Sequence, residues 1–186
     1  MQAPEGPAEG SPAPDDPAAL KALFEGVVQA ARQGGDGSAV VRALEPFLAT
    51  RQDLDALFGP EIGARAWVGY SDKVAAALRE DAGAVVPAQV RAGRTEVWVE
   101  QVGPAFPDRT TAGDQAILDA MHPKRPLYTV RLQRPGEKLG LRLNGFVFLN
   151  GRWRALLKAY DYLAEPPAPD AEPSPPDATV PADAHR

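Results

Sequence analysis

The chain has 186 residues, no cysteine and a formal net charge of −5. The lack of cysteine excludes disulfides, thiolate catalysis and cysteine-type zinc sites. No apolar run approaches the roughly 18 residues that a membrane-spanning helix needs, so we expect no transmembrane segment. No signal peptide is recognisable. The sequence as given therefore suggests a cytoplasmic protein, or an exported or lipid-anchored one if an upstream signal was removed.

Both ends of the chain are rich in proline and acidic residues. Residues 1–16 contain four Pro and four acids, and residues 164–186 contain seven Pro and five acids. Such segments bury too little apolar surface to offset the entropy lost on ordering. We therefore expect disordered tails at 1–16 and 164–186, dispensable for folding. They flank a single domain at 17–163, which is long enough to bury a core.

The charge within this domain is unevenly distributed. Residues 122–160 carry nine Lys or Arg and one acid, Glu137, whereas residues 17–121 are net acidic. This split predicts an electropositive sheet region and an acidic helical region. The simplest interpretation is that the two halves pack together and neutralise each other.

Apolar residues at helical spacing predict several helices in the first half of the chain. The four predicted helices run from Pro17 to just before Gly34, from Ser38 to near Leu48, from Thr50 to Gly59 and from Pro60 to near Asp81. Asp16, Ser38 and Thr50 are side chains that can cap helix N-termini. Pro46 predicts a bend or an early end of the second helix.

Alternating patterns predict strands in the second half. We place them at 84–91, 95–102, 126–133 and, as a final hairpin, 139–157, with one short helix at 114–121 that Thr111 can cap. Pro87 confines the first of these strands to a sheet edge. Pro135 and Gly136 fit the centre of a type II turn.

The final hairpin is the strongest local signal in the chain. Asn150-Gly151 between two alternating runs predicts a two-residue turn, which pairs Phe148 with Trp153. Phe146 and Ala155 then share the face of these two aromatics. The inward-facing apolar residues have odd numbers before Asn144-Gly145 and even numbers after it. This change of alternation predicts a β-bulge there.

This element order predicts an α+β fold, with N-terminal helices packed on one face of a curved antiparallel sheet. The hairpin pattern F-x-F-x-x-G-x-W, here Phe146, Phe148, Gly151 and Trp153, resembles that of the NTF2-like superfamily. The resemblance implies a cone-shaped pocket between helices and sheet. That superfamily includes enzymes, binding modules and scaffolds, so the resemblance does not fix the function.

No recognisable catalytic, metal or cofactor motif is present, and we expect neither a metal nor a cofactor. If the pocket is that of an isomerase- or hydrolase-like enzyme, Asp114 or Asp119 is the candidate base and Tyr128 the candidate donor. This hypothesis requires one of these carboxylates inside an open apolar cavity.

Six aromatic residues either line such a pocket or fill the core between helices and sheet. They are Trp67, Tyr70, Tyr128, Phe146, Phe148 and Trp153. Filling the core is the more common role of such residues.

Four basic residues, Arg131, Arg142, Arg152 and Arg154, are expected on the sheet face away from the aromatics. They either bind an anionic surface or polymer, or form a solvated face that pairs with Glu96 and Glu100. Nucleic acid is not expected, because only Trp98 offers a stacking surface on that face.

The sequence favours a non-catalytic α+β module that binds a small ligand or a protein partner. The alternatives are a pocket enzyme of the NTF2-like kind and a basic sheet face that binds an anionic polymer or surface. The sequence is also compatible with a homodimer.

Overall fold

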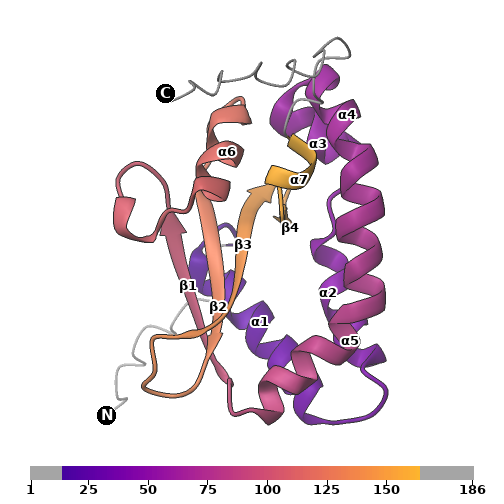
Figure 1. The fold of residues 1–186 in the computed structure, drawn as a ribbon, viewed down its shortest axis with the longest axis vertical. Helices are drawn as coiled ribbons and strands as arrows, with labels where there is room; N and C mark the ends of the chain where they lie inside the picture. The colour runs from indigo at the N-terminus through magenta and orange to yellow at the C-terminus, as the bar shows by residue number, and fades with distance from the viewer. Residues whose placement is uncertain (1–13, 164–186) are drawn as a thin grey trace, which may run out of the picture.

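The computed structural model describes residues 14–163. The tails predicted at 1–16 and 164–186 therefore lie outside the described residues, except for residues 14–16. Within the described part, helices come first and the sheet follows, as predicted (Figure 1). The helical elements are α1 (Pro17–Arg32), α2 (Ser38–Leu44), η1 (Glu45–Phe47), α3 (Arg51–Phe58), α4 (Pro60–Tyr70), η2 (Ser71–Ala75), α5 (Ala76–Arg91), η3 (Pro107–Arg109), α6 (Ala112–Ala120) and α7 (Tyr160–Leu163).

The sheet has four antiparallel strands in the order β1-β2-β3-β4, which confirms the α+β class. The strands are β1 (Glu96–Val102), β2 (Leu127–Gln133), β3 (Gly140–Leu149) and β4 (Arg152–Ala155). Figure 1 shows the sheet on one side of the molecule and the long α4–η2–α5 helix on the other. Helix α1 contacts both β1 and α5, and so connects the two sides.

The hairpin at the end of the sheet has the predicted register. Phe148 pairs with Trp153 and Phe146 with Ala155 across the Asn150-Gly151 turn. The predicted bulge is also present, because the β2–β3 register shifts between Tyr128 and Thr129. Gly145 occupies the bulge with φ +84°, and a Cβ atom there would lie 2.8 Å from the Leu156 carbonyl oxygen. Only glycine fits this position without strain.

The strand predicted at 84–91 is wrong, because these residues form the end of α5. The helix that begins at Pro60 therefore passes the predicted end near Asp81 and runs, through η2, to Arg91. Pro87 inside it removes the donor for the Gly83 carbonyl group. That carbonyl faces the loop before α2, where a Cβ atom on Gly37 would lie 2.0 Å from the Gly83 oxygen. Close packing of α2 on α5 thus offsets a locally poor helix sequence.

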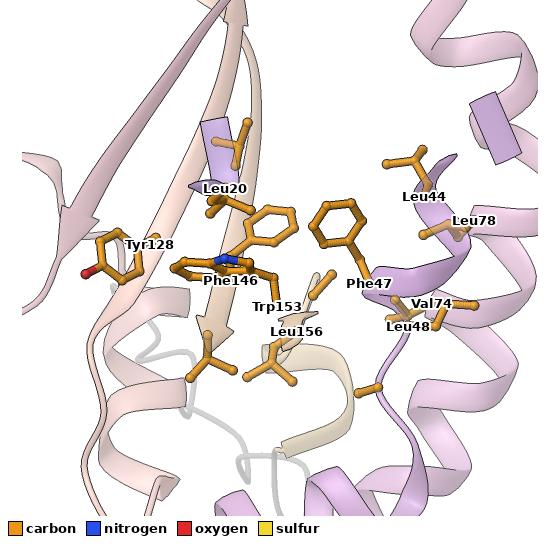
Figure 2. Close-up of a cluster of buried hydrophobic side chains, with 14 of the residues drawn as sticks. Leu20, Leu44, Phe47, Leu48, Val74, Leu78, Tyr128, Phe146, Trp153 and Leu156 are labelled. Atoms are coloured by element: carbon orange, nitrogen blue, oxygen red, sulfur yellow. The ribbon is translucent and has the colours of Figure 1, made fainter. Parts of the chain in front are cut away.

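The core lies between the aromatic face of the sheet and the helices. Figure 2 shows Phe146 on β3 facing Phe47 of η1, with Leu44, Val74 and Leu78 beyond them on the helical side. Phe24, Phe47 and Phe146 form a cluster with ring centroids 5.1–5.9 Å apart. Phe146 packs edge-to-face on the other two rings, and such packing adds to the stabilisation from burial alone.

No helix among residues 14–163 is both long enough and apolar enough to cross a membrane.

Candidate functional site

An open pocket of about 220 Å³ lies between the long helix and the sheet. Its walls come from α1, α2, η1, η2, α5, β3 and β4. Most of the lining is apolar, including Phe24, Phe47, Val74, Leu78, Leu143 and Phe146. Mostly apolar walls with a few polar groups are typical of small-molecule sites, although this pocket is smaller than those of drug-sized ligands.

One wall of this pocket is formed by an irregular segment of the long helix. Residues Ser71–Ala75 adopt π-helical geometry, and Lys73 and Val74 of this segment line the pocket. A π-helical turn inserts one extra residue and changes the direction of the following side chains. Such turns are rare and are frequent at functional sites, so the irregularity marks this wall as a candidate binding surface.

Three charged residues complete the lining. Lys73 and Asp81 come from the long helix, and Lys158 from the segment between β4 and α7. Lys158 has φ +54°, one of two non-glycine residues with positive φ among residues 14–163. Left-handed backbone costs free energy for a lysine and is found preferentially at functional sites.

The candidate base Asp114 lies outside this pocket. It is fully buried at the start of α6, where its Oδ2 atom accepts hydrogen bonds from the Thr111 backbone N–H at 2.9 Å and the Thr111 hydroxyl at 2.8 Å. The guanidinium of Arg142 lies 3.2 Å from the same oxygen. Asp114 therefore caps α6 and fastens it to β3, which is a structural role. Its other oxygen, Oδ1, accepts no hydrogen bond from the described residues.

The structure does not bring the other two catalytic candidates to the pocket either. The ring of Tyr128 packs edge-on against Trp153, on the face of β2 opposite to Thr129 and Arg142. Burial raises the pKa of Tyr128, and the charges of Asp16 and Asp15 add to this rise. Asp119 is exposed on α6 and accepts a hydrogen bond from Gln115 at 2.7 Å.

Most of the six predicted aromatics fill the core. Tyr70, Tyr128, Phe146 and Trp153 are buried, whereas Trp67 and Phe148 are partly exposed. Of the six, only Phe146 lines the pocket beside the long helix. Phe148 and Trp153 line a separate open groove between the hairpin, α1 and η1.

The four basic residues have different surroundings. Arg131 pairs with Glu100 at 2.6 Å, as the solvated-face interpretation expects, and Arg152 is exposed. Arg142 is partly buried beside Asp114. The expectation of a solvated side chain is wrong for Arg154, whose side chain is only 9% exposed.

The buried partner of Arg154 is Asp53 of α3, with Nε and Oδ2 2.9 Å apart. Arg154 also donates to the carbonyl oxygens of Pro46, at 3.2 Å, and Leu48, at 2.9 Å. A buried guanidinium needs such partners, because removing it from water is costly. The pair thereby fastens β4 to the chain between η1 and α3.

A buried tyrosine hydroxyl also links β4 to the chain between η1 and α3. The Tyr70 hydroxyl accepts from the Ala49 N–H and donates to the Ala155 carbonyl, both at 2.9 Å. Burial raises the pKa of Tyr70 to about 12. The hydroxyl therefore stays protonated, and able to donate, at all ordinary pH values.

Residues immediately before α1 contact the hairpin. The indole Nε1 of Trp153 donates to the Pro14 carbonyl at 2.9 Å, and Asp16 caps α1 by accepting from the Ala18 N–H. Pro14 also forms part of the groove beside Phe148 and Trp153. The last residues of the predicted N-terminal tail thus take part in the fold.

This contact predicts different outcomes for two N-terminal deletions. Removal of residues 1–13 should leave the free energy of unfolding unchanged within about 0.5 kcal/mol, because it breaks none of these contacts. Removal of residues 1–15 takes away the acceptor for Trp153 and should cost about 0.5–1.5 kcal/mol. Urea unfolding followed by tryptophan fluorescence measures both values. Equal stability of the two shortened chains would show that the Pro14 contact contributes nothing.

No cluster of three or more potential metal ligands occurs within residues 14–163. In the described part of the chain, Asp114 is the one buried carboxylate with a free oxygen, and the Arg142 guanidinium beside it disfavours a cation there.

Sequence reasoning did not identify the residues that line the pocket, apart from Phe146. Lys73, Asp81 and Lys158 carry no motif, and only tertiary packing brings 73 and 158 together. The π-helical turn has no sequence signature of the kind used above. Gly69, on the long helix, marks close packing against α7, where a Cβ atom on it would lie 2.7 Å from Cβ of Tyr162, but it does not line the pocket.

No protein-family model, curated protein or solved structure was found to match this chain. The resemblance to the NTF2-like superfamily therefore stays a prediction.

Proposed function

We propose that the chain is a non-catalytic α+β module that binds a small, largely apolar ligand in the pocket between the long helix and β3. The observation that carries this proposal is the pocket itself, which is open, mostly apolar and walled by a π-helical turn. Its place between helices and sheet is the one that the NTF2-like resemblance implies.

The absence of the catalytic candidates from the lining supports a binding role. Asp114 is engaged in capping α6, and Tyr128 packs against Trp153. Asp119 lines a different open pocket, between α6 and the end of β1. The one carboxylate in the lining, Asp81, has no His or Tyr beside it in the lining. The lining thus lacks the combination of a carboxylate with a neighbouring Tyr or second acid that the pocket-enzyme alternative requires.

The proposal is tested by filling the pocket. Ala77 lines it on α5, whereas Ala88 is exposed on the same helix and does not line it. Ala77→Phe should weaken binding of the neutral fluorophore N-phenyl-1-naphthylamine at least tenfold, because the ring occupies space that the ligand needs. Ala88→Phe should bind like the unchanged protein. Fluorescence titration measures the dissociation constants, and circular dichroism checks that both variants fold.

Two results would contradict the proposal. One is the absence of saturable fluorophore binding by the unchanged protein. The other is equal affinity of the Ala77→Phe and Ala88→Phe variants, which would place the fluorophore elsewhere, for example in the groove beside Trp153.

A further inference from the structure

We infer that the natural ligand is an amphiphile with an anionic head group, bound by Lys73 and Lys158 at one end of the pocket. Its apolar body lies along α5 toward Asp81. This inference rests on the proposed function and adds the chemical class and the orientation of the ligand.

Two separate backbone irregularities bring the lysines to the pocket. Lys73 belongs to the π-helical turn, and Lys158 has a left-handed backbone conformation just after β4. The Lys73 Nζ atom lies 3.5 Å from the Asp161 carbonyl oxygen, three residues after Lys158. This contact places Lys73 beside the segment that carries Lys158. The two positive charges therefore occupy the same end of the pocket.

Neither lysine is neutralised by an ion pair within residues 14–163. Lys73 makes only the long contact with the Asp161 carbonyl, and an ammonium group has three donors. Free donors therefore remain on both side chains for an anionic oxygen. A carboxylate between two ammonium groups forms charge-assisted hydrogen bonds, which are stronger than neutral ones.

Asp81 sets the direction of the ligand. It lines the pocket eight residues after Lys73, about 12 Å along the helix axis at 1.5 Å per residue. An anion is repelled at that end and attracted at the lysine end. Val74, Ala77 and Leu78 lie between these ends and provide an apolar wall for a hydrocarbon body.

Three ligands with ten-carbon chains test the head group, each used below its aggregation concentration. They are decanoate, decanol and decyltrimethylammonium, and displacement of N-phenyl-1-naphthylamine reports their binding. Decanoate should bind about tenfold more tightly than decanol, and the cation should bind most weakly. The preference for decanoate should shrink in 1 M salt, where the Debye length falls to about 3 Å.

Lysine variants test which positive charges produce the preference for decanoate over decanol. The double variant Lys73→Gln, Lys158→Asn should lose the preference for decanoate over decanol but keep decanol binding; asparagine tolerates the left-handed backbone at 158. Lys138→Gln is the matched control, since Lys138 is exposed in the β2–β3 loop and does not line the pocket. It should keep the full preference.

The outcomes separate the two proposals. If the unchanged protein binds decanoate and decanol equally at low and high salt, the head-group inference is wrong and the pocket function stands. If none of the ligands displaces the fluorophore, or if the fluorophore does not bind, the pocket function itself fails. If the double variant kept the preference for decanoate, cationic residues other than Lys73 and Lys158 would have to bind the head group.

Discussion

Trp153→Ala is expected to lower the free energy of unfolding by about 3–5 kcal/mol, the usual cost of emptying a buried aromatic site. The side chain is 3% exposed and packs edge-on against Tyr128 and Phe148, with centroid distances of 5.4 Å in both cases. The substitution also removes the donor to the Pro14 carbonyl. A loss of this size is a large share of the 5–15 kcal/mol typical of a domain.

The matched control is the neighbouring residue. Arg152 is exposed in the same strand, so Arg152→Ala should cost about 0.5 kcal/mol or less. Urea unfolding of both variants gives the comparison. Equal destabilisation would contradict the observed hairpin register. A stable Trp153→Ala protein would show instead that the tryptophan serves the adjacent groove rather than the core.

Arg154→Leu is expected to destabilise the protein by about 3–5 kcal/mol, although Arg154 was predicted from sequence to be a surface residue. Removing one member of a buried ion pair leaves the other charge without compensation. Here the group that loses its counter-charge is Asp53, which is 3% exposed and keeps only the neutral hydrogen bonds from Thr50 and Asn150. The carbonyl oxygens of Pro46 and Leu48 also lose a charged donor.

Two further variants isolate the contribution of the ion pair. Arg51→Leu removes an exposed partner of Asp55 on α3 and should cost no more than about 0.5 kcal/mol. Combining Arg154→Leu with Asp53→Asn should recover part of the loss, because no charge is then left buried. Thermal or urea unfolding of the single and double variants measures this coupling. If the Arg154→Leu variant were as stable as the unchanged protein, water would have to enter and solvate Asp53.

Local signals predicted much of this fold. The Asn150-Gly151 turn determined the hairpin register, and Thr50 and Thr111 cap α3 and α6 as expected. The parity change at Gly145 correctly predicted the bulge. These features depend on residues close together in sequence, which is why the sequence alone was sufficient.

Features that depend on distant contacts were not predicted. The helix through Pro87 depends on packing against α2, and the burial of Arg154 depends on Asp53, far away in the sequence. The pocket wall depends on a π-helical turn whose side-chain directions differ from those of a regular helix. In each case tertiary structure overrides the local preference.

The contacts that hold β4 in place have a consequence for how the chain folds. They join residues far apart in sequence: Trp153 to Pro14 over 139 positions, Arg154 to Leu48 over 106, and Tyr70 to Ala155 over 85. Closing such large loops costs entropy before any contact compensates for it, so we expect folding to be slow for the size of the domain. During synthesis on the ribosome, we therefore expect the part of the helical surface that β4 covers to stay exposed until this strand emerges.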